Sequence, residues 1–142
     1  VIKTYEKIIS KNNISIKFNK TDNFKIIGDR DKLIEIFTNL IDNSIKYSDK
    51  NKEITITAKK DGGLNVVSVA DQGIGIPKES IHRITERFFT VDPSKSRSVG
   101  GTGLGLAIVK HLVSQHRAEM DINSVENEGT TIDIKFNPLW FN

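Results

Sequence analysis

The sequence contains no cysteine in its 142 residues. Disulfide bonds and thiolate metal sites are therefore excluded, which is consistent with a reducing compartment. The chain also lacks any apolar run near the roughly 18–20 residues that cross a bilayer, and no signal-peptide pattern opens it. We expect a cytoplasmic module whose longer parent protein could still be membrane-anchored.

Charge of one sign is not in excess either. The 21 lysine and arginine residues nearly balance the 18 aspartate and glutamate residues, which leaves a net charge of +3. There is no clustered basic stretch, so nucleic acid is not an expected partner. Repeats, low-complexity tracts and internal linkers are absent, and the hydrophobic content of 37% can form a core. The sequence predicts a single domain over residues 1–142.

The first half of the chain changes its hydrophobic period several times. Residues 1–11 have apolar side chains at helical spacing, and because the chain starts without methionine we interpret them as a helix entered midway. Alternation from Ile14 to Phe18 predicts a strand, and a second short strand is expected at residues 24–27. A long helix, capped by Asp29 or Asp31, should then run to about residue 47.

The second half predicts hairpins around two further helices. Strands at 54–58 and 64–69 flank the turn Asp61-Gly62-Gly63, and the second of them should end at Asp71. Residues 77–89 are expected to form a short helix, and 90–101 a polar loop longer than most connections. A helix at 104–116 should precede strands at 120–125 and 131–136, joined by the turn Asn127-Glu128-Gly129. The expected fold is an α/β (α+β) two-layer sandwich, with a mixed, mostly antiparallel sheet covered by helices on one face.

Glycine is concentrated at two places. Four glycines fall within the six positions 100–105, directly before an apolar helix. Backbone N–H groups without side-chain bulk can surround an anion, and the helix N-terminus adds positive potential, so this run favours phosphate binding. A second pair, Gly73 and Gly75, follows the strand that ends at Asp71. One such motif is weak evidence, whereas their combination with the asparagine pair described next is much stronger.

Asn39 and Asn43 are four residues apart and therefore share one face of the long helix, which Lys46 and Tyr47 extend by a turn. An amide oxygen suits Mg²⁺ when a nucleotide already supplies the negative charge. Taken alone, such a pair is more often two exposed polar residues of a helix, and only the glycine motifs favour the ligand role.

Asp71 should place its carboxylate at the end of a mostly buried strand, where it needs a donor. The exocyclic amine of adenine could supply that donor, since an unpaired acceptor there would cost about 1–3 kcal/mol. The alternative is a simple turn former before Gly73.

These motifs together carry a resemblance to a known family. The set Asn39-x-x-x-Asn43, Asp71-x-Gly73-x-Gly75, Glu86-Arg87-Phe88-Phe89 and Gly101-Thr102-Gly103-Leu104-Gly105-Leu106 resembles the catalytic ATP-binding domain of two-component sensor histidine kinases. That domain has the Bergerat fold, shared with DNA gyrase, mismatch-repair ATPases and a heat-shock chaperone. In detail, segments 87–97 and 100–111 are similar to phosphate-regulon sensor kinases of the PhoR type.

The resemblance implies that Asn43 ligates Mg²⁺ and that Asn39 contacts the phosphates of ATP. Lys46 would lie near the phosphates and Tyr47 beside the nucleotide. In ATPase relatives the position of Asn39 is a glutamate that activates water, and an amide cannot take that proton. Slow hydrolysis and phosphoryl transfer to a separate acceptor are therefore expected.

The base and the lid follow from the same resemblance. Asp71 would bind the adenine amine, and Thr130 would support Asp71. The adenine pocket would be shaped by Gly73, Gly75 and Ile76. A mobile lid over the phosphates would be formed by Gly101, Thr102, Gly103, Leu104, Gly105 and Leu106.

The implied phosphoryl acceptor is a histidine followed by an acidic residue, on a helical dimerisation domain. His82, His111 and His116 precede Arg83, Leu112 and Arg117, so none of them fits, and each is expected to have a surface or packing role. The acceptor is thus expected on a missing segment, connected through residues 1–11. The resemblance further implies a homodimeric parent and a response regulator as its partner.

Three positions depart from the family pattern. Thr85 replaces a common aromatic residue, and Thr90 replaces an arginine proposed to meet the γ-phosphate. Arg87 or Arg97 could compensate, although exposed arginines are more often only solvated. Arg117-Ala118 replaces a common glycine pair, so the preceding helix should end without the usual left-handed glycine.

Three other functions stay open at this point. One is a serine kinase of the anti-sigma-factor type, which uses the same nucleotide fold on a different acceptor. Another is a catalytically degenerate, nucleotide-sensing module, suggested by Thr90. The last is an α/β domain that binds no nucleotide.

Overall fold

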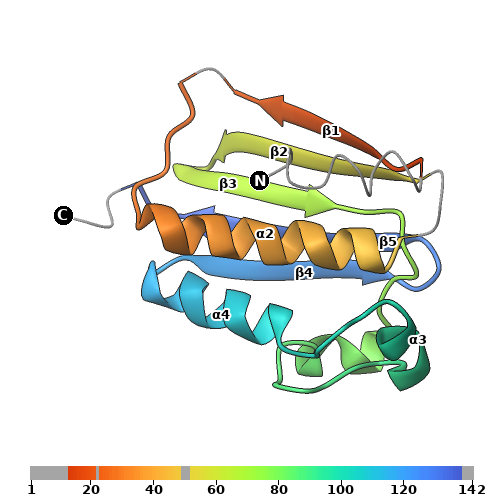
Figure 1. Ribbon diagram of the computed structural model, residues 1–142. Coiled ribbons are helices and arrows are strands. Elements are labelled where there is room, and N and C mark those ends of the chain that lie inside the picture. Colours follow the sequence, from red (N-terminus) through yellow and green to blue (C-terminus); the bar gives the residue numbers. More distant parts are fainter. Residues whose placement is uncertain (1–12, 22, 49–51, 139–142) are drawn as a thin grey trace.

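The chain folds into one five-stranded sheet with helices across one face (Figure 1). The computed structural model describes residues 13–21, 23–48 and 52–138, so the expected helix at 1–11 lies outside the described residues. The strand order is β1-β2-β3-β5-β4. β1 (Ser15–Lys20) is parallel to β2 (Glu53–Asp61), and the remaining neighbours are antiparallel. The predicted mixed, mostly antiparallel two-layer fold is confirmed.

Both predicted hairpins are present. β2 turns into β3 (Leu64–Ala70) through Gly62 and Gly63, whose φ angles are 57° and 84°. β4 (Glu119–Val125) turns into β5 (Gly129–Phe136) through a loop in which Asn127 has a φ of 67°. Positive φ angles are the reason for the glycine and asparagine residues at these turns.

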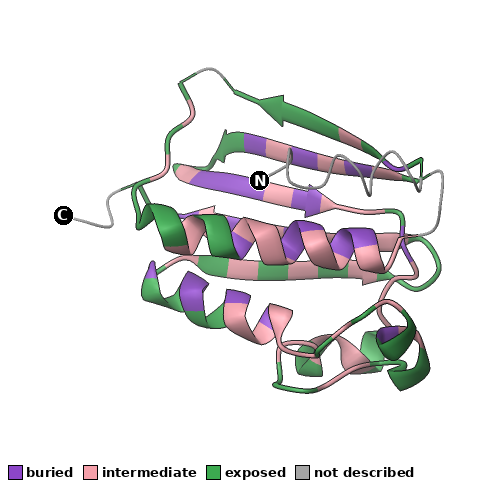
Figure 2. Cartoon of the chain, in the orientation of Figure 1, coloured by how far each residue is buried: buried purple, intermediate pink, exposed green. Residues whose placement is uncertain are grey.

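The core lies between the sheet and the two long helices, α2 (Arg30–Lys46) and α4 (Gly105–Gln115). Asp29 caps α2 by accepting a hydrogen bond from the Lys32 N–H at 3.1 Å. Figure 2 shows buried positions along β2 and β3, which lie above α2 in this view. The largest fully buried side chains come from both layers, namely Ile36, Leu40, Ile54, Val109 and Ile134. None of the described helices is both long and apolar enough to cross a membrane.

Residues 24–27 do not form the expected strand. The segment runs from the end of β1 to the start of α2 without pairing to the sheet. Phe24 and Ile26 pack against the core instead, and the Lys25 carbonyl accepts a hydrogen bond from the Asn65 amide at 3.1 Å. The apolar alternation that predicted a strand therefore reflects anchoring to the core.

The connection between β3 and α4 also differs from expectation. The predicted helix at 77–89 is shorter, because only a 3₁₀ helix, η2 (Lys78–Arg83), forms there. Phe88 has a φ of 65°, which no helix accommodates, and its N–H donates to the Gly103 carbonyl at 2.8 Å. The expected loop at 90–101 contains a short helix, α3 (Pro93–Ser98), whose N-terminus is capped by Asp92.

The end of α4 adopts a left-handed conformation without glycine. Arg117 has a φ of 51°, and the Ala118 N–H donates to the Val113 carbonyl at 3.1 Å. The expectation of no left-handed glycine is confirmed, but Arg117 takes up the left-handed conformation itself. Next to it, His116 is buried and has the packing role expected for it.

Candidate nucleotide-binding site

A cavity opens where the C-terminal half of α2 meets the 71–76 segment, the 89–92 segment and the N-terminus of α4. Most of the predicted site residues line this cavity: Asn39, Asn43, Lys46, Tyr47, Asp71, Gly75, Ile76, Gly101, Thr102, Gly103, Gly105, Leu106 and Thr130. They come from segments that are far apart in the sequence. The fold therefore gathers the asparagine pair and both glycine motifs around one hollow.

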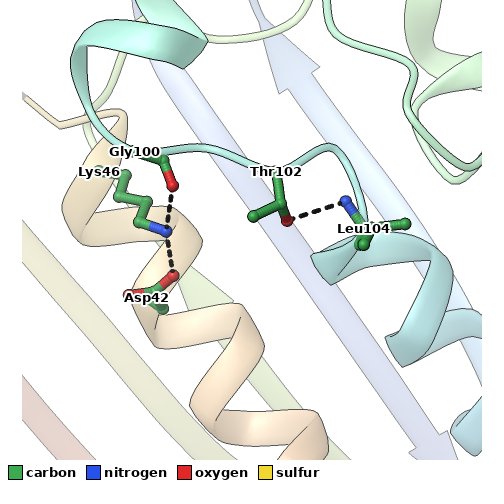
Figure 3. Close-up of polar contacts among 5 residues, drawn as sticks. All are labelled: Asp42, Lys46, Gly100, Thr102 and Leu104. Atoms are coloured by element: carbon green, nitrogen blue, oxygen red, sulfur yellow. Dashed lines mark hydrogen bonds and ion pairs between the residues drawn. The ribbon is translucent and has the colours of Figure 1, made fainter.

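Gly73 and Leu104, also predicted, do not line the cavity but support its walls. A Cβ on Gly73 would collide with the Tyr47 carbonyl oxygen, so only glycine lets this segment lie against the end of α2. Leu104 directly precedes α4, and its N–H donates to Thr102 Oγ1 at 3.2 Å (Figure 3). Thr102 thereby braces the glycine run at its entry into the helix.

Asp71 is held at one end of the cavity, directly after β3. Its Oδ1 accepts hydrogen bonds from the Gly73 N–H at 2.9 Å and the Thr130 N–H at 3.1 Å. The support expected from Thr130 therefore comes from its backbone. Burial raises the pKa of the Asp71 carboxyl above its ordinary value of 3.8, although the N–H groups of Gly73 and Thr130 and the Ser44 hydroxyl oppose that rise. The sequence analysis expected this carboxylate to need a donor, and the structure shows that backbone N–H groups of the protein already supply two.

The helix face of the cavity carries amide oxygens. Asn39 Nδ2 donates to the Glu35 carbonyl at 2.8 Å, which commits the amide nitrogen to the helix itself. Its Oδ1 lies toward the start of α4, where a Cβ on Gly105 would be 3.4 Å away. Asn43 lies one turn further along α2 and also faces the cavity. Neutral oxygen ligands therefore meet the N-terminus of α4, where phosphate binding is favoured.

Lys46 connects α2 to the glycine run. Its Nζ lies 2.9 Å from Asp42 Oδ2 and donates to the Gly100 carbonyl at 3.3 Å, as Figure 3 shows. Lys46 is the single lysine or arginine among the described residues that line the cavity. Arg87 and Arg97, considered above as substitutes for the arginine replaced by Thr90, do not line it. Among the described residues, the end of the cavity at the glycine run thus has one positive side chain.

The sequence analysis missed several lining residues. Asp42 could have been found from its i,i+4 spacing to Lys46, and Asp92 from the cap signature Asp-Pro before α3. Phe89 belongs to the 86–89 motif quoted above but was assigned no role in the site. The other apolar lining residues carried no signal of their own, because they reach the cavity through the fold: Ile74, Ile84, Val91 and Ile132.

No group of three or more His, Asp or Glu side chains in the described part of the chain could hold a metal ion. Mg²⁺ bound to a nucleotide requires few protein ligands, because phosphates and water supply the rest. The amide oxygens of Asn39 and Asn43 fit that requirement, since Mg²⁺ at phosphates needs only one or two protein oxygens.

The chain is similar to known proteins over most of its length. A family model described as histidine kinase-, DNA gyrase B-, and HSP90-like ATPase matches residues 28–139. The sensor-like histidine kinase SenX3 of Mycolicibacterium smegmatis is 40% identical over 121 residues, which are 85% of this chain and 32% of SenX3. The phosphate regulon sensor protein PhoR of Pseudomonas aeruginosa is 43% identical over 111 residues, which are 78% of this chain and 25% of PhoR. The chain thus spans a third or less of these relatives.

Solved structures show the same likeness. Full-length ShkA in complex with AMPPNP superposes with a TM-score of 0.82 at 26% identity, covering 95% of this chain and 28% of ShkA. Histidine kinase ThkA in complex with the response regulator protein TrrA gives a TM-score of 0.76 at 26% identity, covering 94% of this chain and 36% of ThkA. On the matched family model and these identities, the chain belongs to the histidine kinase-, DNA gyrase B- and HSP90-like ATPases and is similar to the sensor histidine kinases among them.

Proposed function

We propose that this chain binds Mg-ATP and donates the γ-phosphoryl group to a histidine on the dimerisation domain of a homodimeric parent sensor kinase, for relay to a response regulator. The observation that carries the proposal is that Asp71, Asn43 and the glycine run line the same cavity. The complexes of ShkA with AMPPNP and of ThkA with TrrA support the nucleotide and the partner by similarity.

The proposed pose follows the chemistry of the cavity. Adenine lies at Asp71, and the phosphates extend toward the N-terminus of α4, whose backbone N–H groups favour negative charge. Asn43 ligates Mg²⁺, and Asn39 contacts the phosphate end of the nucleotide with its side-chain Oδ1 on that side. Mg²⁺ bound there supplies neutralisation of the β- and γ-phosphate charge. Lys46 exchanges the Gly100 carbonyl for a phosphate oxygen.

Transfer is favoured over hydrolysis because no carboxylate lining the cavity is available to activate water. Asp42 is paired with Lys46, and Asp92 accepts from the N–H groups of Ser94 and Lys95. Asp71 is committed at the base end. Asn39 has no basic group, so a water at the γ-phosphate lacks a proton acceptor.

Isothermal titration with AMPPNP, in the presence and absence of Mg²⁺, tests the binding. We expect Mg²⁺-dependent affinity that Asn43→Ala lowers at least about tenfold, the usual effect of losing a hydrogen bond or ligand to a charged group. Asn19→Ala, an exposed asparagine on β1, is the matched control and should bind as wild type. Equal affinity of wild type and Asn43→Ala would contradict the metal assignment.

The transfer step is tested in the full-length parent with γ-labelled ATP. Label on an acid-labile, base-stable phosphoramidate supports a histidine acceptor, and acid-stable label indicates a serine kinase instead. A second candidate is a nucleotide-sensing module. It is favoured because, with Thr90 in place of an arginine, Lys46 is the one positive side chain among the described residues that line the cavity. Binding of Mg-AMPPNP without any label transfer would establish that second function.

A further inference from the structure

Ser124 stands directly behind the base end of the cavity without lining it. It lies on β4 opposite Thr130 of β5, on the sheet face that carries Ile132 and the helices. Thr130, Asp71 and Ile76 line the cavity, and Ser124 contacts two of them. Any effect of Ser124 on a ligand must therefore pass through these neighbours.

All three contacts of the Ser124 hydroxyl can be hydrogen bonds at the same time in one arrangement of protons. Its Oγ accepts from the Ile76 N–H at 2.8 Å and donates its own proton to the Gly129 carbonyl at 3.0 Å. Ser124 Oγ also lies 2.8 Å from Thr130 Oγ1. Since a serine hydroxyl has one proton, this third contact is a hydrogen bond only if Thr130 is the donor.

In this arrangement the Thr130 hydroxyl donates its proton to Ser124 and can act only as an acceptor toward the cavity that Thr130 lines. Beside it, the Thr130 N–H holds the Asp71 carboxylate, which is also an acceptor. Neighbouring backbone leaves little room to rearrange, because a Cβ on Gly129 would collide with the Asp71 carbonyl and one on Gly75 with the Val125 carbonyl. The base end of the cavity thus has two acceptors, the Asp71 carboxylate and the Thr130 hydroxyl, on closely packed backbone.

We infer that Ser124 is a positioning residue that selects a nucleobase with an exocyclic 6-amino group. By taking the Thr130 proton, Ser124 keeps that hydroxyl an acceptor, so a 6-amino group finds acceptors while a 6-oxo group meets oxygen with oxygen. This inference rests on the proposed function, because it assumes that the base lies at Asp71.

Mg-ADP and Mg-IDP are suitable probes, since they differ in carrying a 6-amino or a 6-oxo base. Wild type should prefer Mg-ADP in isothermal titration. Ser124→Ala frees the Thr130 proton to face the 6-oxo group, so the ADP-to-IDP preference should fall about three- to tenfold, the usual range for one hydrogen bond. Loss of the Ile76 contact weakens both nucleotides alike and does not enter that ratio.

Four further variants separate positioning from mere stability. Ser124→Thr keeps the hydroxyl and should restore the preference, and Ser68→Ala, a strand serine that bonds Asp133 away from the site, should leave it unchanged. In a Thr130→Val background, Ser124→Ala should no longer alter the ratio. If Ser124→Ala does not fold, Ser124→Cys provides the same loss of a strong acceptor at similar size.

The outcomes distinguish this inference from the function on which it rests. A preference for Mg-ADP that falls in Ser124→Ala and returns in Ser124→Thr supports it. Wild type that binds both probes, with the same ratio in Ser124→Ala, overturns the role of Ser124 and leaves the proposed function intact. Wild type that binds neither probe overturns the proposed function and this inference together.

Discussion

At the scale of single residues, Asp71 combines burial with a charge that the proposed site needs. Its carboxyl receives two backbone N–H groups, yet burial is the larger effect and raises its pKa above the ordinary 3.8. The protonated form is therefore favoured in the folded chain more than in the unfolded chain. This carboxyl favours folding most at low pH, and that contribution is lost as the pH rises through the raised pKa.

Nucleotide affinity should depend on pH in the opposite direction. The adenine amine needs the ionised carboxylate, so affinity should fall as the pH drops toward the raised pKa of Asp71. Asp71→Asn removes that dependence and should weaken Mg-ADP at pH 7.5 by about 2 kcal/mol, because a donor then faces a donor. The check is titration calorimetry of both proteins between pH 8 and pH 5.

Phosphate groups of the nucleotide also titrate in this range, but they do so equally with wild type and with Asp71→Asn. The ratio of the two affinities therefore isolates Asp71, and it should shrink toward low pH. A ratio that stays constant from pH 8 to pH 5 would show that this carboxylate does not contact the base.

At the scale of elements, the end of α4 stores strain at Arg117. The residue has a φ of 51°, while its side chain is exposed. Glycine adopts this conformation without the clash between Cβ and carbonyl that other residues have. Arg117→Gly should raise the free energy of unfolding by about 0.5–1 kcal/mol, measured by urea denaturation.

Gln115→Gly is the matched control for that variant, because Gln115 is the last residue of α4 and has helical geometry. There glycine should lower the free energy of unfolding by up to about 1 kcal/mol. Two variants that both destabilise would show that the Arg117 side chain contributes more than its backbone strain costs.

His116 joins the end of α4 to the start of α2. His116 is 4% exposed, its Nδ1 lies 2.8 Å from the Leu112 carbonyl oxygen, and its Nε2 accepts from the Asp29 N–H at 3.1 Å. The ring also meets Phe136 edge-on at a centroid distance of 6.5 Å. The imidazole thus closes the end of one helix against the cap of the other.

His116→Ala should lower the free energy of unfolding by about 2–4 kcal/mol through the cavity and the unpaired Asp29 N–H. His82→Ala, on the exposed η2 helix, should change it by less than about 0.5 kcal/mol.

A Cβ on Gly28 would lie 2.7 Å from the His116 ring, so Gly28→Ala should destabilise wild type more than it destabilises His116→Ala. Thermal and urea unfolding of these variants decide the matter, and additive effects would contradict the contact.

At the scale of the whole molecule, residues 90–101 contact α2 through Gly100, whose carbonyl accepts from Lys46. Within the segment the Gly101 N–H donates to the Ser96 carbonyl at 2.7 Å, and just after it Gly103 packs on the Phe88 backbone. A nucleotide that draws Lys46 onto its phosphates would replace one of these attachments with several contacts of its own.

Trypsin should therefore cleave after Lys95 and Arg97 more slowly when Mg-AMPPNP is bound, because the ligand stabilises the nucleotide-bound form of this segment. At a ligand concentration of about 100 times the dissociation constant, the protection should approach about 2.7 kcal/mol, or a hundredfold. Cleavage after Lys20, at the far end of the sheet, is the internal control. Equal rates at Lys95 and Arg97 with and without nucleotide would argue against a lid.

Local signals in the sequence determined the strands, the two long helices and the identity of most cavity residues. Alternation predicts β2 because one face of the sheet is buried, and the apolar run after the Gly62-Gly63 turn predicts β3 as its hairpin partner. Asp29 predicts the start of α2 because its side chain can satisfy a free N–H there. Asn39, Asn43, Asp71 and the glycine run were recognisable as candidate site residues because their combination resembles the motifs of a known ATP-binding family. The fold class followed from the order of these elements.

Only the tertiary structure decided the rest, because those features depend on partners distant in the chain. Residues 24–27 have the pattern of a strand but no neighbouring strand to pair with, and Phe88 leaves helical geometry because its N–H reaches Gly103. Ser124 becomes meaningful only when β4 and β5 carry it to Ile76 and Thr130, since no local pattern records which hydroxyl gives up its proton. Spacing along a chain determines periodic faces, whereas proton direction and long-range hydrogen bonds are determined by the packed fold.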